Sequence, residues 1–246
     1  MLRFQQAEFV YEPYPICLIP SAIAEGDYQE MLKTYPDVSL FEFKPKLGNK
    51  YSLSERNNRE EYAKFISRSP LWSRFHSYIK SRNFTDDTLA LLKSNNIDLD
   101  LDGYVFRKAR GKPKRSLMSK LLDRTELNAR FEFSMMSSTG GHIRPHTDEP
   151  KKLITLVVSI VEASGWSSEW GGGTQVCFPR DRTRSYNQTN EYLDFDQVET
   201  LRDYAFKPNQ CLLFIKTYNS WHHVQPMTAP EGSPMRKTLT INIERL

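Results

Sequence analysis

The second half of the chain, from residue 127 onward, is made of short segments in which apolar and polar residues alternate. Ala129, Phe131 and Phe133 alternate with polar neighbours, and residues 237–243 (KTLTINI) repeat the pattern. Successive side chains of a strand point to opposite faces of a sheet, so a period of two indicates β-strands. Several short strands joined by turns predict a β-sandwich or a barrel.

Other segments of the second half have the apolar composition of buried strands. We expect strands at residues 153–161, 174–178 and 206–215. Lys151 and Lys152, just before the first of these, are expected to face solvent. Residues 180–203 are hydrophilic with little apolar periodicity, so we expect a surface insertion there, which is a candidate lid.

The first half of the chain shows helical periodicity in places and irregular composition elsewhere. Apolar residues recur at helical spacing in residues 60–81, which predicts one long helix. Shorter helices are expected at residues 21–32, where the first residue is a candidate N-cap, and at residues 85–92. Residues 7–20 suggest a short strand broken by prolines, and residues 38–60 look irregular and polar.

Together these patterns predict an α+β fold in a single domain. Residues 1–126 would form a helical and irregular part that supports a β core of residues 127–246. The 246 residues suit one large domain, and 39% hydrophobic content is enough to fill its core. Cys17, Cys177 and Cys211 are odd in number and far apart, so we expect reduced, buried thiols.

The charge of the chain is weakly positive: a formal net charge of +4 neither requires nor excludes an anionic partner. No apolar run approaches the ~18 residues of a membrane span and the first residues lack a leader pattern, so a cytoplasmic protein is expected. Residues 107–120 carry seven basic residues and no acidic one, a pattern that could meet phosphate backbones. Few aromatic residues accompany them for base stacking, so a solvated loop is favoured and nucleic-acid binding is the weaker alternative.

The tripeptide His146-Thr147-Asp148 is the first candidate for chemistry. In an extended strand, side chains at i and i+2 share a face, so H-x-D presents an imidazole and a carboxylate side by side. These are two of the three ligands of a 2-His-1-carboxylate facial triad. An H-x-D arises easily by chance, so the tripeptide needs support from the rest of the chain.

Two later motifs supply that support. His222 lies in the sequence SWHHV, shortly after the apolar segment 211–215, from where a histidine can reach a metal held by a neighbouring strand. Arg236 and Thr238 share one face of the last strand, so a guanidinium and a hydroxyl would converge on one anion. Arginine is suited to bidentate binding of a carboxylate, whereas lysine is only a point charge.

Four motifs, taken in order, resemble one family. HTD at 146–148, GGGT at 171–174, SWHHV at 220–224 and RKT at 236–238 are similar to the 2-oxoglutarate- and Fe(II)-dependent dioxygenases, closest to the prolyl 4-hydroxylase-like branch. The resemblance covers about residues 127–246. It implies a double-stranded β-helix, or jelly-roll, with the N-terminal helices packed on its outside.

The resemblance also implies residue roles. His146 and Asp148 match the proximal iron ligands and His222 the distal ligand. Arg236 matches the residue that binds the remote carboxylate of 2-oxoglutarate, with Thr238 as its hydroxyl helper. The intact carboxylate of Asp148 points to hydroxylation, because halogenating members of the wider superfamily lack it.

The distal motif departs from the family pattern. The family usually shows H-G-V, whereas this chain reads H-H-V at 222–224. His222 is favoured as the ligand because it aligns with the motif, and His223 takes the place of the small residue. His142 and Arg144 share parity with His146, so each has either a structural or a substrate-side role.

The implied reaction uses Fe(II), 2-oxoglutarate and O2, with ascorbate as an accessory reductant. An unactivated C–H bond of a small-molecule or peptidyl substrate would be hydroxylated, with release of succinate and CO2. Two alternatives remain: a catalytically silent jelly-roll module that keeps a metal for structure, and a nucleic-acid-acting oxygenase that uses residues 107–120.

Overall fold

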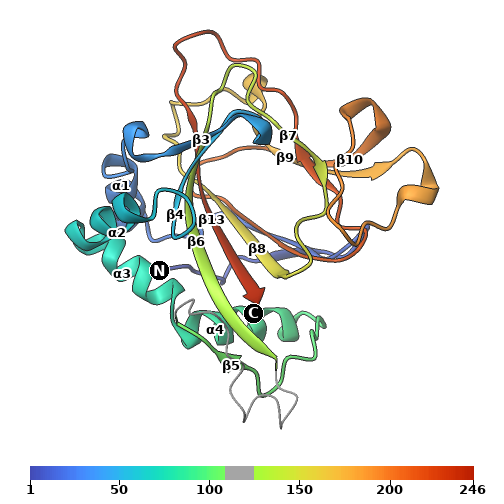
Figure 1. Ribbon diagram of the computed structural model, residues 1–246, viewed down its shortest axis with the longest axis horizontal. Coiled ribbons are helices and arrows are strands. Elements are labelled where there is room, and N and C mark those ends of the chain that lie inside the picture. The colour runs from blue at the N-terminus through green and yellow to red at the C-terminus, as the bar shows by residue number, and fades with distance from the viewer. Residues whose placement is uncertain (109–124) are drawn as a thin grey trace.

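The structure is a computed structural model that describes residues 1–108 and 125–246 (Figure 1). These residues form a mixed fold of antiparallel sheets and helices, with the helices lying on the outer side of the larger sheet (Figure 1). None of the described helices is long and apolar enough to cross a membrane. Of the basic segment 107–120, only Arg107 and Lys108 lie within the described residues.

The larger sheet has nine strands, all paired antiparallel except β5, which runs parallel to β6. In order across the sheet, with β5 (Val105–Phe106) beside β6, the strands are β1 (Glu8–Val10), β2 (Ile16–Ile19), β11 (Cys211–Ile215), β8 (Lys152–Ser159), β13 (Arg236–Arg245), β6 (Glu126–Met136), β4 (Lys50–Ser54) and β3 (Glu42–Lys44).

The smaller sheet has four antiparallel strands, in the order β10 (Val198–Tyr204), β9 (Thr174–Pro179), β12 (His222–Val224) and β7 (Ile143–His146). Short 3-10 helices occur in the connections: η1 (Val38–Leu40), η2 (Pro45–Leu47), η3 (Ser168–Trp170), η4 (Arg182–Arg184) and η5 (Phe195–Gln197).

In β6 of the larger sheet, both the apolar and the polar residues of the alternating pattern are buried. On β6, Phe131 and Phe133 pack under the helices, as the period of two requires. The polar residues that alternate with them, Arg130, Glu132 and Ser134, are also buried and line a cavity between the two sheets. Both faces of β6 are therefore covered, one by an apolar core and the other by a polar interior.

The four helices are α1 (Glu25–Lys33), α2 (Arg59–Arg68), α3 (Pro70–Ile79) and α4 (Arg82–Ser94). The prediction of one helix over 60–81 is wrong, because α2 and α3 are separate. Pro70 lacks an N–H and keeps the residue before it out of the helical conformation. Ser69 therefore adopts an extended conformation, and its Oγ accepts a hydrogen bond of 3.4 Å from the backbone N of Trp72, which caps α3.

The other helix starts also differ from the predictions. The first helix begins at Glu25 rather than at residue 21, and its N-cap is Ala24, which makes no side-chain cap. Helix α4 begins at Arg82, three residues before its predicted start, because Ser81 accepts a hydrogen bond from the backbone N of Phe84 (3.2 Å).

Helix α3 packs against β6 of the larger sheet. Trp72 is fully buried, with ring centroids 4.8 Å from Phe133 and 6.3 Å from Phe131. Phe75 approaches Phe131 at 5.4 Å. The Trp72–Phe131 pair is stacked and the other two are edge-to-face, and aromatic contacts of both kinds add to the free energy gained from burying the rings.

The first half contributes more strands than its composition predicts. Residues 38–60 contain β3 and β4, and the proline-broken segment 7–20 forms both β1 and β2. These strands have three to five residues, which is too short for periodicity to reveal. Strands β2 and β4 pair with β11 and β6, which are distant in sequence, and β1 and β3 are added at the edges by pairing with β2 and β4. Strands from before residue 126 therefore belong to the same sheet as β6, β8 and β13.

Residues 180–203 are also less separate than predicted. They contain most of β10, which pairs with β9, and they bury Leu193 and Val198. The three cysteines are free and buried, as predicted. Burial raises the pKa of the Cys17 and Cys177 thiols to about 12, so neither is a reactive thiolate at neutral pH.

The aromatic cluster under the helices generates a stability prediction. We expect Phe133→Ala to lower the free energy of unfolding by about 3–5 kcal/mol, since it removes a fully buried ring and leaves a cavity. Urea denaturation followed by circular dichroism measures this, with Tyr186→Ala as the control because that ring is 77% exposed. A loss in Phe133→Ala no larger than in the control would contradict this account of the core.

Candidate active site

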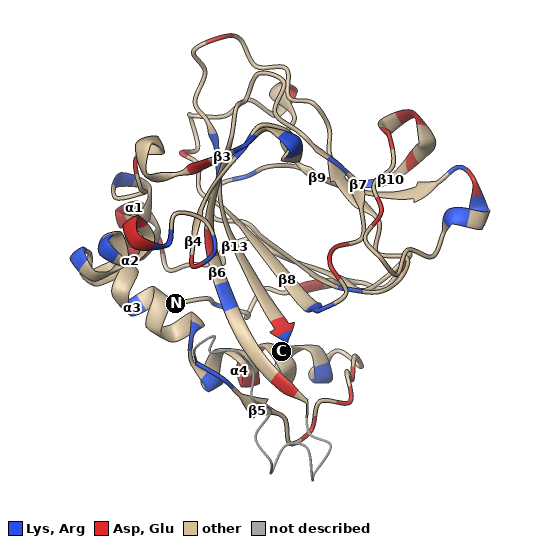
Figure 2. Cartoon of the chain, in the orientation of Figure 1, with Lys and Arg blue, Asp and Glu red and all other residues tan. Residues whose placement is uncertain are grey.

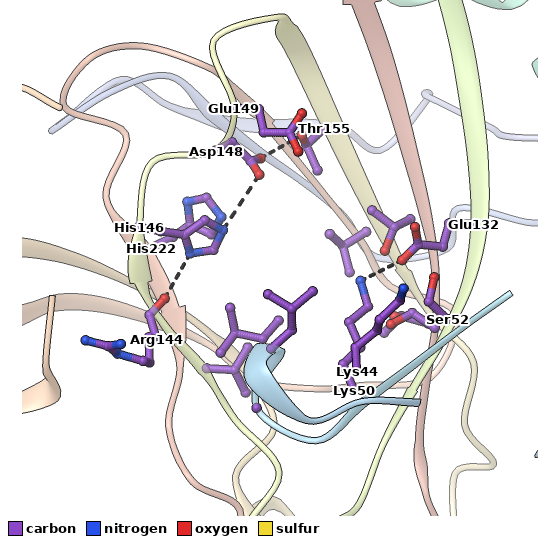
Figure 3. A pocket seen from close by; sticks show the side chains of 18 of the residues that line it. Lys44, Lys50, Ser52, Glu132, Arg144, His146, Asp148, Glu149, Thr155 and His222 are labelled. Carbon is purple, nitrogen blue, oxygen red and sulfur yellow. Dashed lines mark hydrogen bonds and ion pairs between the residues drawn. The ribbon is translucent and has the colours of Figure 1, made fainter. Parts of the chain in front are cut away.

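A cavity of about 490 Å³ lies between the two sheets (Figure 3). The larger sheet lines it with the polar faces of β4, β6, β8 and β13. The smaller sheet lines it with residues of β7, β9 and β12. A cavity of this size is in the range of small-molecule sites, and residues from both halves of the chain meet in it.

Three of the predicted site residues come together at one end of this cavity. His146, Asp148 and His222 are all buried, and their ligand atoms lie within 4.8 Å of one another. The two imidazole centroids are 4.4 Å apart, and His146 Nε2 lies 3.7 Å from Asp148 Oδ1. Figure 3 shows the three side chains converging. This donor set of two imidazoles and one carboxylate fits a non-haem Fe(II) site.

The geometry that brings Asp148 to the site differs from the prediction. Strand β7 ends at His146, so the two residues do not share one strand face. Asp148 instead has a φ of +73°, in the left-handed region that aspartate tolerates better than most residues. The turn directs the carboxylate toward the imidazoles, so the i, i+2 argument finds the right residues through the wrong conformation.

The two histidines are oriented by backbone carbonyls. His146 Nδ1 donates to Arg144 O and His222 Nδ1 donates to Ser220 O, both at 2.9 Å. Because a carbonyl only accepts, Nδ1 carries the proton in each ring and Nε2 is left for a metal. Burial, with His146 beside it, lowers the pKa of His222 to about 3, so this imidazole is neutral.

The carboxylate of Asp148 is held on both oxygens. Thr155 Oγ1 donates to Oδ2 at 3.0 Å, and Lys152 Nζ contacts Oδ1. Burial disfavours the charged carboxylate, but Lys152 and the two histidines outweigh it and hold the pKa of Asp148 well below its usual range. The prediction that Lys152 faces solvent is therefore wrong, because its side chain is directed inward to this carboxylate.

The second histidine of the distal motif does not join this group. His223 packs against Phe195, with ring centroids 5.6 Å apart, and neither ring nitrogen has a hydrogen-bond partner among the described residues. Burial lowers its pKa to about 4. His142 also lies against Phe195, at 5.7 Å, whereas Arg144 lines the cavity and pairs with Asp194 at 2.7 Å.

Arg236, at the start of β13, is buried and lines the same cavity. Its Nε donates to Gly172 O at 2.6 Å, and its guanidinium lies 4.8 Å from the centroid of the Phe206 ring. Within the described residues, no carboxylate pairs with it. Burial lowers its pKa to about 10, so it remains a cation at neutral pH.

An unpaired buried cation is costly unless a ligand supplies the counter-charge. Arg236 and the buried hydroxyl residue Thr238 thus form a site suited to one carboxylate. The position of Gly172, which accepts the hydrogen bond from Arg236, requires glycine. Its φ is +82°, and a Cβ there would lie 2.8 Å from the Trp166 side chain.

Sequence reasoning missed one aromatic residue of the site. Tyr192 lies within the segment predicted as a surface insertion, yet its ring stacks on His146 at 5.4 Å and lines the cavity. Leu193 N donates to Pro145 O at 3.0 Å, which fixes this segment beside β7. A single tyrosine in a hydrophilic stretch gives no periodic signal that could have identified it.

Comparisons with known proteins agree with this geometry. The sequence profile of the 2OG-Fe(II) oxygenase superfamily matches residues 131–244. The fold is similar to that of a prolyl-4-hydroxylase from Pseudomonas putida, with a TM-score of 0.56 and 11% identity over 96% of this chain and 95% of the other. It also resembles prolyl 4-hydroxylases from Phytophthora capsici, with a TM-score of 0.52 and 18% identity over 94% of this chain and 58% of the other. No curated protein sequence matches the chain significantly.

The convergence of three ligands predicts which substitutions abolish metal binding. We expect added Co(II) to raise the Tm of the wild type, since a metal that binds only the folded state stabilises it. His146→Ala, Asp148→Ala and His222→Ala should lose this rise, whereas His142→Ala and His223→Gln should keep it. Thermal denaturation with and without Co(II) measures the effect. If His223→Gln lost this rise in Tm and His222→Ala kept it, the distal ligand would be His223 and the assignment to His222 would be wrong.

Proposed function

We propose that the chain, whose residues 131–244 match the 2OG-Fe(II) oxygenase superfamily, is an active 2-oxoglutarate- and Fe(II)-dependent dioxygenase that hydroxylates an unactivated C–H bond. His146, Asp148 and His222 would hold the iron, and Arg236 with Thr238 would bind the remote carboxylate of 2-oxoglutarate. When bound, Fe(II) and 2-oxoglutarate supply oxidising power from O2, with succinate and CO2 as coproducts.

The buried guanidinium of Arg236 is the single observation that carries this proposal. It lies in the same cavity as the three ligands and has no carboxylate partner among the described residues. Its hydrogen bond to Gly172 O and its contact with the Phe206 ring leave the charge without a counter-ion, and burying a cation in that state costs free energy. A dicarboxylate that also reaches the metal would supply the missing charge.

The chain's own residues would position the reactants and limit water. The carbonyls of Arg144 and Ser220 fix the two imidazoles, and Thr155 fixes the carboxylate. Tyr192 covers one face of His146. Pre-oriented groups of this kind lower the cost of assembling a reactive complex.

The same proposal extends to the fold. We infer that the two sheets form the double-stranded β-helix of the superfamily, with β7, β12 and β13 carrying the metal and cosubstrate residues.

The catalytically silent module fits less well, because a structural metal site is closed by protein ligands. Here the three ligands open onto a cavity of about 490 Å³. Of the basic segment 107–120, the described Arg107 is paired with Glu126, which leaves it less available to a phosphate backbone.

Activity is tested by cosubstrate turnover. We expect the protein, supplied with Fe(II), ascorbate and O2, to convert 2-oxoglutarate to succinate, measured by mass spectrometry. His146→Ala should lower the rate to the background of iron and ascorbate alone, because one of three iron ligands is lost. His142→Ala is the matched control. Succinate formation in His146→Ala at the wild-type rate would reject the proposal.

Cosubstrate binding gives a second prediction. We expect Arg236→Lys to raise the KM for 2-oxoglutarate about ten- to a hundredfold, because lysine cannot form the two parallel hydrogen bonds that arginine makes to a carboxylate. Steady-state kinetics with varied 2-oxoglutarate measure this change. Arg182→Gln, an exposed residue paired with Glu199, is the control. An unchanged KM in Arg236→Lys would place the cosubstrate elsewhere.

A further inference from the structure

Three lysines line the cavity on the side away from the triad. Lys44 ends β3, Lys46 lies in the turn η2 and Lys50 begins β4; together they are named the lysine hairpin. Figure 3 shows Lys44 and Lys50 side by side, across the cavity from His146. Figure 2 shows basic residues on the turn that follows β3.

The lysine hairpin brings like charges together. Lys44 and Lys50 are direct register partners in the antiparallel β3–β4 pair. Like charges directly opposite each other destabilise a strand pair, so the Lys44–Lys50 juxtaposition itself does not stabilise β3 against β4. Lys44 is paired with Glu42 at 2.5 Å and Lys50 with Glu132 at 2.6 Å, whereas Lys46 has no ion pair within the described residues.

The rest of the cavity does not neutralise the hairpin. Eight basic and three acidic side chains line the cavity. Four of the basic side chains outside the hairpin form ion pairs with carboxylates. Lys152 contacts Asp148, Arg144 pairs with Asp194, and Arg56 and Arg130 pair with Glu244. Glu132, the partner of Lys50, is shared with Arg130. Lys50 therefore shares one carboxylate with Arg130, and Lys46, whose side chain is exposed, adds a positive charge with no ion pair among the described residues.

The position of the hairpin is fixed relative to the triad. His142 N donates to Gly48 O at 3.3 Å, which joins the turn after η2 to the residue before β7. Gly48 has a φ of +72°, and a Cβ there would lie 1.7 Å from His142 O, so the close approach requires glycine. The hairpin also lies outside residues 131–244, the part matched by the superfamily profile.

We propose that the substrate is a small anionic molecule whose carboxylate or phosphate group binds the lysine hairpin. This inference rests on the proposed function, since it assigns the substrate of the same cavity. The oxidised carbon would then lie between the hairpin and the triad. A cavity of about 490 Å³ accommodates a small molecule beside the cosubstrate rather than a folded partner.

Binding tests the proposal without turnover, so its outcome is independent of the activity. The probes are two pairs, each an anion with its neutral analogue: glycerol 3-phosphate with glycerol, and N-acetylglycine with N-acetylglycinamide. Ligand-observed NMR is recorded with redox-inert Zn(II) at the triad and 2-oxoglutarate saturating, so that the cosubstrate site is filled. We expect at least one anion to bind and its neutral counterpart not to bind.

The variant Lys44→Ser/Lys46→Ser should weaken binding of that anion by about tenfold or more, because two charge-assisted contacts are lost. Lys207→Ser is the matched control, since Lys207 is exposed and outside the cavity lining. The proposal is overturned if neither anion binds, if neutral and charged probes bind alike, or if the double variant binds as the wild type does.

The two sources of the anion are separated with a small-molecule extract. Its anion-exchange fraction should stimulate succinate release, and phosphatase treatment should remove the stimulation if the group is a phosphate but spare it if the group is a carboxylate. Stimulation confined to the fraction that the anion exchanger does not retain would contradict the proposal. Succinate release without any added extract reports the proposed function separately.

Discussion

The antiparallel pairing of β7 with β12 places His222 directly opposite His146, and the site depends on this register. Successive side chains of a strand alternate between faces, so a slip of one residue would exchange His222 for His223. The H-H-V sequence offers both imidazoles, and strand pairing decides which one meets the other ligands. Because the register is also tied to β9, through the pairing of His222 with Val176, the choice is made by backbone hydrogen bonds before any metal binds.

A second constraint is the polar face of the larger sheet. Arg130 bonds both Glu132 and Glu244, and Lys50 adds a further contact to Glu132. Burial opposes charge on Glu132, yet Lys50 and Arg130 lower its pKa to about 2. Buried ion pairs contribute little net stability, so the aromatic packing on the opposite face must hold the sheet together. The strands β6 and β13 thus separate two tasks by face: stability toward the helices and chemistry toward the cavity.

The sequence predicts this separation only in part. Long alternating segments such as 237–243 are visible because their period is local, and the metal and carboxylate-binding residues stand in recognisable motifs. The apolar periodicity does not predict the break between α2 and α3 at Ser69, because the apolar stripe continues through both helices. Pro70 is the one local signal of this break. Strand β4 depends on its pairing with β6, much later in the chain, which no local pattern encodes. The left-handed turn at Asp148 and the contact of Lys152 with this carboxylate are local, but neither leaves a periodic signal in the sequence.

The strand that carries His146 also anchors both sides of the cavity mouth. Leu193 N bonds Pro145 O on one side, and Gly48 O accepts from His142 N on the other. Hydrogen bonds therefore fix the segments that carry Tyr192 and the lysine hairpin next to β7, the strand of the proximal metal ligand His146. Groups fixed to one rigid element keep their separation when the rest of the protein fluctuates, which is what selective oxidation of one C–H bond requires. The lysine hairpin, which lies outside the part matched by the superfamily profile, is thus held in a fixed position relative to the metal site.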